Sequence, residues 1–75
     1  MNIVIYHGNN CKACHEEMEY LKCNNVAFTP KNVHDNAEAR QELIALGSKT
    51  IPTTVIDGEV IVGLDIERIK DLVGL

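Results

Sequence analysis

Two cysteines separated by two residues, Cys11 and Cys14, stand where an apolar run at residues 3–6 gives way to a stretch with helical periodicity. This placement predicts a strand that delivers a dithiol to the N-terminus of a helix. A helix start carries unsatisfied N–H groups and about half a positive charge, which favour a thiolate over a thiol. Because the thiolate is the nucleophile, the position favours redox chemistry of the two sulfurs.

Two neighbours of the cysteines are candidates for tuning that chemistry. Lys12 places a positive charge next to Cys11, and His15 lies four residues after Cys11 on the same side of the expected helix. His15 either tunes Cys11 and moves a proton to a leaving thiolate, or is a solvated residue of the helix surface. We expect His7 and His34 to be surface residues.

The same letters fit other kinds of site. Residues 11–15 read Cys-x-x-Cys-His, which also describes covalent attachment of a c-type haem, although the alternating strand and helix signals around it do not suit that chemistry. Structural zinc needs four ligands, and no second cysteine or histidine pair stands at zinc spacing, so no metal ligands are assigned. A soft-metal carrier, or an iron–sulfur module that uses the same two thiols, is kept as the alternative function.

Length and charge narrow the class of protein. Seventy-five residues predict one domain, residues 1–75, and three cysteines cannot form a closed disulfide framework. The net charge of −4 without a basic stripe argues against nucleic acid as a partner. No apolar run approaches the roughly 18 residues of a membrane span, and no export signal is evident at the start. We therefore expect a cytoplasmic monomer that binds neither nucleic acid nor membrane.

Hydrophobic periodicity predicts seven elements in the order β-α-β-α-β-β-α. Helical spacing puts Cys14, Met18 and Leu21 on the inner stripe of the first helix. Asp35 is expected to be the N-cap of the second helix, with Glu38 three residues later. The predicted strands cover residues 2–6, a segment beginning at 26–28, and residues 53–56 and 59–62; the predicted helices cover residues 11–24, 35–46 and the segment after Asp65.

The order of elements predicts the architecture. Two strands joined by a helical crossover should be parallel, and the pair around Asp57 and Gly58 should form an antiparallel hairpin. Pro30 lacks an N–H donor, which places the second strand at an edge. The fold class is therefore α/β, with a four-stranded mixed sheet, helices on both of its faces and the order of elements of the thioredoxin-like fold.

Over essentially its whole length the chain resembles a short bacterial glutaredoxin-like protein. Three features carry the resemblance: the strand and Cys11-Lys12-Ala13-Cys14, then Thr50-Ile51-Pro52, then Val62-Gly63-Leu64-Asp65. The resemblance implies a thiol–disulfide oxidoreductase in which Cys11 attacks a protein disulfide and Cys14 resolves the mixed disulfide. It also implies a cis peptide bond before Pro52 and substrate contacts from Thr50, Ile51, Pro52, Gly63, Leu64 and Asp65.

Two positions depart from the family pattern. Glutathione-using glutaredoxins generally place a lysine three residues before the first cysteine, where this chain has Gly8. Their Gly-Gly-(Cys/Ser)-Asp segment is reduced here to Val62, Gly63, Leu64 and Asp65. We therefore expect no bound cofactor and a protein dithiol or flavoenzyme as the better reductant, with glutathione kept as an alternative co-substrate.

Cys23 is the third thiol. It follows Cys14 by nine residues, which on an ideal helix is about 13 Å along the axis and on the opposite side. A disulfide needs Cα atoms within about 7 Å, so Cys23 is not expected to pair with either cysteine of the motif.

Overall fold

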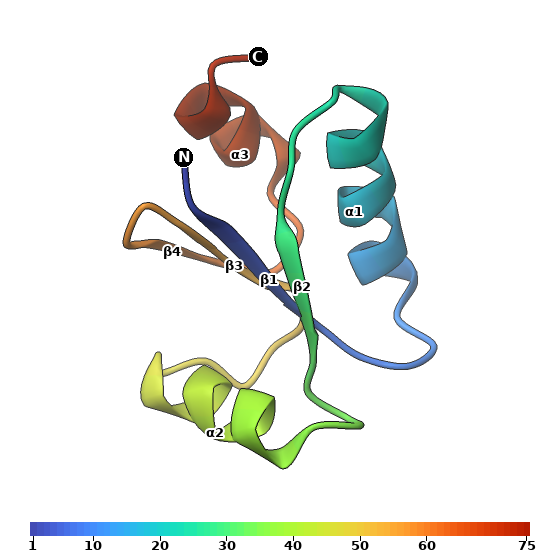
Figure 1. Cartoon of the computed structure of the whole chain (residues 1–75), viewed down its shortest axis with the longest axis vertical. Coiled ribbons are helices and arrows are strands. Elements are labelled where there is room, and N and C mark those ends of the chain that lie inside the picture. The colour runs from blue at the N-terminus through green and yellow to red at the C-terminus, as the bar shows by residue number, and fades with distance from the viewer.

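The elements follow the predicted order β-α-β-α-β-β-α in the computed structural model, which describes all residues from 1 to 75. Figure 1 shows a twisted sheet at the centre, with helices packed on either side of it. The strands are β1 (Ile3–His7), β2 (Thr29–Asn32), β3 (Thr53–Ile56) and β4 (Glu59–Val62), and the helices are α1 (Lys12–Cys23), α2 (Ala37–Ala45) and α3 (Ile66–Val73).

The sheet is mixed and has the strand order β2-β1-β3-β4. Strand β2 runs parallel to β1 with Val4 opposite Thr29, whereas β1 with β3 and β3 with β4 are antiparallel. Strand β2 is an edge strand and contains Pro30, as the missing donor of proline predicts. The expected four-stranded mixed sheet is confirmed.

Each face of the sheet carries its own hydrophobic cluster. On one face, Leu21 of α1 and Ile69 of α3 pack on strand side chains, and both residues are fully buried. On the other face, Ala39 and Leu43 of α2 pack against Tyr6. Helices therefore cover both faces, which fixes α1 against the sheet and positions its N-terminus (Figure 1).

The hairpin between β3 and β4 turns at the predicted dipeptide. Asp57 and Gly58 have φ values of 47° and 90°, the pattern of a type I′ turn, which matches the twist of the two strands. The backbone N–H of Asn2 donates to Asp57 Oδ1 at 2.8 Å and ties the turn to the start of the chain. No helix has the length and apolar composition needed to cross a membrane.

The second strand begins later than predicted. The apolar residues Val26 and Phe28 pack on the core cluster but lie before the strand, which starts at Thr29. The N–H of Val26 instead donates to Leu21 O at 2.9 Å and closes the C-terminus of α1. This use of its backbone keeps Val26 out of the sheet.

The N-cap of α2 is Asn36, so the prediction of Asp35 is wrong by one residue. The side-chain oxygen of Asn36 accepts from the N–H of Ala39 at 3.0 Å. The N–H groups of His34 and Asp35 are bound by Asn32 Oδ1, at 2.8 and 3.1 Å. Because the backbone N–H of Asp35 is bound in this turn, Asp35 lies before the helix, and the cap is the next residue, Asn36.

Candidate active site

Cys11 is the N-cap of helix α1. The N–H of Cys14 donates to Cys11 Sγ at 3.2 Å, so the sulfur receives one of the N–H groups that the helix leaves unpaired. The first turn of the helix has no acidic side chain. The helix dipole and this N–H therefore both favour negative charge on the Cys11 sulfur, as the sequence predicts.

The two cysteines of the motif are bonded to each other and differ in exposure. Their Cα atoms are 5.2 Å apart, inside the range that a disulfide requires. Cys14 is 1% exposed, whereas Cys11 is only partly buried. Cys11 is therefore the more accessible of the two residues from solvent.

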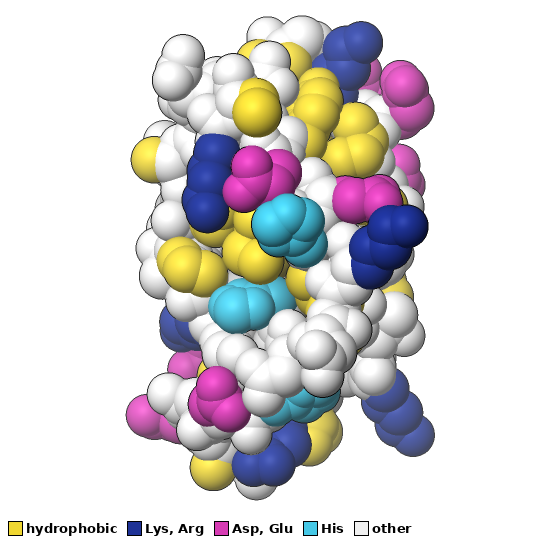
Figure 2. Space-filling view, turned by 90° about the vertical axis from the view of Figure 1, so that its right-hand side faces the viewer, with side chains coloured by type: hydrophobic (Ala, Val, Ile, Leu, Met, Phe, Trp, Pro, Cys, Tyr) yellow, Lys and Arg dark blue, Asp and Glu magenta, His cyan; other side chains and the backbone are white.

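A surface hollow of about 640 Å³ lies beside the disulfide. Figure 2 views the molecule from the side of α1 and shows histidine side chains gathered on this face. His7 and His15 both line the hollow with Cys11 and Cys14. His7 is half-buried rather than a surface residue, because it ends β1 next to the dithiol.

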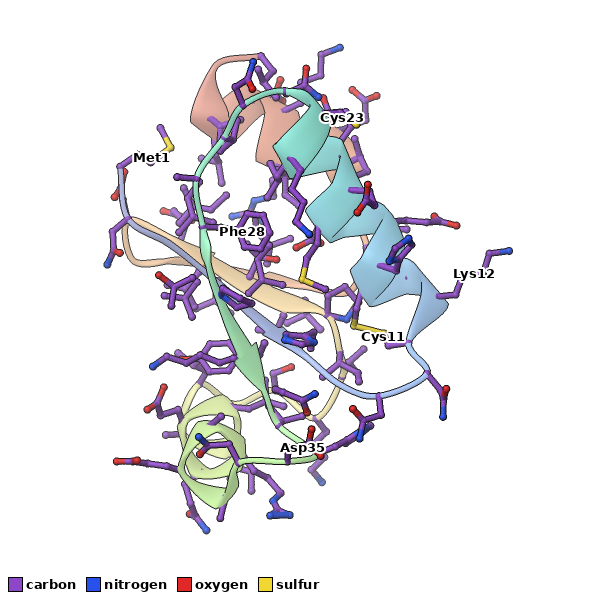
Figure 3. All side chains as sticks on the ribbon, turned by 45° about the vertical axis from the view of Figure 1, so that its right-hand side comes forward. Met1, Cys11, Lys12, Cys23, Phe28 and Asp35 are labelled. Atoms are coloured by element: carbon purple, nitrogen blue, oxygen red, sulfur yellow. A yellow bond between two sulfur atoms is a disulfide. The ribbon has the colours of Figure 1, made fainter.

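The two candidate tuning residues are both exposed. Lys12 and His15 line the same hollow, but the side chain of Lys12 points away from the disulfide (Figure 3). No group of three or more histidine, cysteine, aspartate and glutamate side chains is arranged to hold a metal ion. Cys23 is a free, exposed thiol at the opposite end of α1 from Cys11 (Figure 3), and it forms no bridge.

The segment Thr50-Ile51-Pro52 adopts the backbone that the resemblance implies. The peptide bond between Ile51 and Pro52 is cis, and Pro52 is buried. Two hydroxyls hold this segment: Ser48 Oγ accepts from the N–H of Thr50 at 3.2 Å, and Thr53 Oγ1 donates to Thr50 O at 2.5 Å. Thr50 itself is exposed and Ile51 is half-buried.

A hydrogen bond joins this segment to the second one predicted to bind substrate. The N–H of Gly63 donates to Pro52 O at 2.8 Å, which brings Gly63, the residue before Leu64 and Asp65, beside the proline. Leu64 is 41% exposed, and Asp65 caps α3 by accepting from the N–H of Arg68 at 3.1 Å. None of these six residues lines the hollow at the disulfide, which is formed by residues 7–12, Cys14, His15, Met18 and Asn32.

Gly8 connects the two regions. A Cβ atom on Gly8 would lie 2.5 Å from His34 Cε1 and 2.7 Å from Ile51 Cδ1, so only glycine fits there without movement. The imidazole of His34 is held in place by the N–H of Asn9, which donates to His34 Nδ1 at 2.8 Å. The position of the family lysine is thus covered by a histidine ring.

Met18, expected on the inner stripe of α1, is partly buried and packs against the core cluster. The sequence did not predict that Glu17, also on α1, is fully buried. The hydroxyl of Thr54 donates to Glu17 Oε2, while Glu17 Oε1 has no hydrogen-bond partner. Burial raises the pKa of Glu17, and the hydrogen bond from Thr54 partly opposes this rise. Its spacing of three residues from Cys14 and four from Leu21 was the signal that could have placed it inside.

The other titratable groups with shifted pKa values lie on the α2 side of the sheet. Burial and the hydrogen bond to Glu42 raise the pKa of Tyr6. The pKa of Glu42 is lowered because Lys31 and Tyr6 both donate to its carboxylate. These groups form a polar contact between β1, β2 and α2, and none of them lines the hollow beside the disulfide.

Comparisons of sequence with known proteins agree on one family. A model of the glutaredoxin family matches residues 3–61. An uncharacterised glutaredoxin-like 8.6 kDa protein in the rubredoxin operon of Clostridium pasteurianum is 36% identical over 72 residues, which cover 95% of this chain and 96% of that protein. Glutaredoxin 3 of Escherichia coli is 34% identical over 65 residues, which cover 85% of this chain and 78% of that protein.

Solved structures agree with this result. The thioredoxin-like protein BC3987 has a TM-score of 0.91 and 40% identity, with 95% of this chain and 99% of that chain covered. NrdH-redoxin from Escherichia coli has a TM-score of 0.87 and 28% identity, with 96% of this chain and 95% of that chain covered. With its thioredoxin-like fold and its Cys11–Cys14 pair at disulfide distance, the chain belongs to the glutaredoxin family of thiol–disulfide oxidoreductases.

Proposed function

We propose that this protein reduces disulfides of other proteins, with Cys11 as the nucleophile and Cys14 as the resolving cysteine. The observation that carries the proposal is the asymmetry of the pair. Cys11 is accessible and caps a helix, whereas Cys14 is 1% exposed and lies within bonding distance of it. This arrangement suits an outer thiolate that meets the substrate and an inner thiol that reacts only with Cys11.

The reaction has two exchange steps. The Cys11 thiolate attacks one sulfur of the substrate disulfide, the substrate S–S bond breaks, and the other substrate sulfur leaves as a thiolate that takes up a proton. Cys14 then loses its proton and attacks Cys11 Sγ, which releases the second substrate sulfur. Two electrons pass to the substrate, and the Cys11–Cys14 disulfide remains to be reduced by an external dithiol.

We further propose that a protein dithiol, such as that of a flavoenzyme, recycles the protein better than glutathione does. The lysine that glutathione-using relatives place at position 8 is absent, and the space beside Gly8 is filled by His34 and Ile51. Loss of one charge-assisted hydrogen bond weakens a small ligand by about ten- to a hundredfold. NrdH-redoxin, whose structure resembles this one, is described as having a thioredoxin-like activity profile, which supports the same preference.

Trapping of the mixed disulfide tests the catalytic assignment. Cys14→Ser should accumulate a covalent complex with a disulfide-containing protein substrate such as insulin, because the resolving thiol is missing. Cys11→Ser should form no such complex and should have no reductase activity. Equal trapping by both variants, or alkylation of Cys14 before Cys11 in the reduced protein near neutral pH, would contradict the assignment.

Turnover with each reductant tests the recycling proposal. Steady-state reduction of insulin is measured with glutathione and glutathione reductase, and separately with thioredoxin reductase and NADPH. Faster turnover with the flavoenzyme supports the proposal, and efficient turnover at millimolar glutathione alone refutes it. The metal content of the protein as purified, measured together with these rates, tests the alternative of a metal-binding module.

A further inference from the structure

Glu17 is the one fully buried carboxyl group of the chain, and the exchange steps above do not use it. One of its oxygens accepts a hydrogen bond from Thr54, and the other has no partner. Buried polar atoms in proteins are nearly always paired, so an unpaired carboxyl oxygen indicates a role other than packing. A group that gains and loses a proton during the reaction would account for the free oxygen.

The position of Glu17 relative to Cys14 suits such a role. The two residues are three positions apart on α1 and are both buried, and residues at this spacing lie on the same side of a helix with Cβ atoms about 5–6 Å apart. Long helical side chains lean toward the N-terminus of their helix, so the carboxyl of Glu17 leans toward the turn that holds Cys14. Thr54, which fixes this carboxyl, follows the buried Pro52 by two residues.

The surroundings of Glu17 contain no charged partner. The sheet and α3 contribute the apolar side chains of the core cluster and the hydroxyl of Thr54 to this side of α1. On its own helix the buried titratable neighbour of Glu17 is Cys14, and Cys14 in turn lines the hollow together with Cys11, Lys12, His7 and His15. Burial raises the pKa of Glu17, and no neighbouring charge contributes to the shift. A carboxyl in this state binds a proton more readily than an exposed one.

We propose that Glu17 accepts the proton of the Cys14 thiol when Cys14 attacks the mixed disulfide. In this step the S–H bond of Cys14 breaks, its proton moves to the carboxylate of Glu17, and the new S–S bond forms between Cys14 and Cys11. The substrate sulfur leaves with the electron pair of the broken mixed disulfide. Glu17 afterwards gives up its proton, which restores the carboxylate for the next cycle.

The expected size of the effect follows from the thiol. A cysteine with an ordinary pKa of about 8.5 is only about 3% thiolate at pH 7, so a local base can speed its attack by about tenfold or somewhat more. The effect should disappear at high pH, because the thiol then ionises without help. An altered packing of the helix would slow the attack equally at every pH.

The two exchange steps can be measured separately with the reduced protein and a chromogenic aromatic disulfide. The first release of the aromatic thiol reports attack by Cys11, and the second reports resolution by Cys14. Glu17→Gln keeps the shape of the side chain and an acceptor for Thr54 but cannot take up a proton. Glu16→Gln, one residue away and exposed, is the matched control.

We expect Glu17→Gln to leave the first release unchanged and to slow the second about tenfold at pH 7, with the difference closing above about pH 9. Glu16→Gln should match the unmodified protein in both phases. An unchanged second phase, or a slowing that is the same at every pH, overturns the role of Glu17. This inference rests on the proposed function, and the two fail differently: without a first release from Cys11, the proposed function itself is wrong.

A measurement on the unmodified protein guards against misfolding of the variant. With glutamate labelled at the side-chain carboxyl carbon, NMR follows the titration of Glu17 in the oxidised and the reduced protein. Exchange of a proton between Glu17 and Cys14 requires the two groups to be coupled, so the titration of Glu17 should move when the disulfide is reduced. Identical titration curves in both states overturn the proposal.

Discussion

The buried carboxyl of Glu17 should cost the protein stability at neutral pH. Its oxygen Oε1 has no partner, and an unpaired buried polar atom typically costs about 1–3 kcal/mol. Replacing both members of the buried pair by apolar side chains of similar shape, Glu17→Met with Thr54→Val, removes that cost and leaves no new polar atom unpaired. We therefore expect the double variant to be more stable by about 1–3 kcal/mol at pH 8.

The gain should depend on pH in a defined direction. Burial raises the pKa of Glu17 in the folded protein above its value in the unfolded chain, so folding is favoured while the carboxyl is protonated. That contribution is fully present below the unfolded pKa and is lost as the pH rises through the folded one. The advantage of the double variant should therefore be small near pH 4 and larger at pH 8.

Urea unfolding of the oxidised proteins, followed by far-UV circular dichroism, measures the effect, since the chain has no tryptophan to report fluorescence. A gain of 1 kcal/mol in a domain of this size raises Tm by about 4–8 °C, so thermal unfolding gives a second reading. Thr54→Val alone is the control and should be destabilising, because it removes the one donor to Glu17. A double variant that is less stable than the unmodified protein at pH 8, or a gain independent of pH, would refute this reasoning.

Three further predictions concern other positions. Cys23→Ser should leave insulin reduction and the Cys11–Cys14 bridge unchanged, because Cys23 is exposed at the far end of α1; peptide mapping of the oxidised protein that finds Cys23 in an intramolecular bridge would be the contrary result. Asn36→Ala should lower the free energy of unfolding by about 0.5–2 kcal/mol through loss of the α2 cap, and Asp35→Ala by less; the reverse order in urea unfolding would restore Asp35 as the cap. Ile69→Ala should cost about 2–5 kcal/mol, because Ile69 is fully buried between α3 and the sheet; a loss below 1 kcal/mol in the same assay would show that α3 is not part of the core.

The features that could be predicted are those set by residues close together in sequence. The dithiol at a helix start follows from the change of periodicity around Cys11, and the type I′ turn follows from the dipeptide Asp57-Gly58. The edge position of β2 follows from Pro30, because proline has no backbone N–H and cannot donate to a neighbouring strand on that side. In each case one short segment contains the whole physical cause.

The features that could not be predicted depend on contacts between distant segments. Glu17 is tolerated inside because Thr54, 37 residues later, donates to it, and the pattern of α1 alone treats a glutamate as a surface residue. The choice between Asp35 and Asn36 as cap is made by Asn9 and Asn32, whose side chains engage the loop before α2. Both residues are good caps in isolation, so local propensity could not separate them.

The edge strand β2 also bears on how molecules of this protein behave at high concentration. An exposed strand edge offers free N–H and C=O groups on which another chain can add a strand, the first step of many aggregation reactions. Here the edge is four residues long, and it includes Pro30, which has no N–H to offer, and the charged side chain of Lys31. The residue that places β2 at the margin of the sheet thus also makes that margin a poor template for intermolecular β-structure.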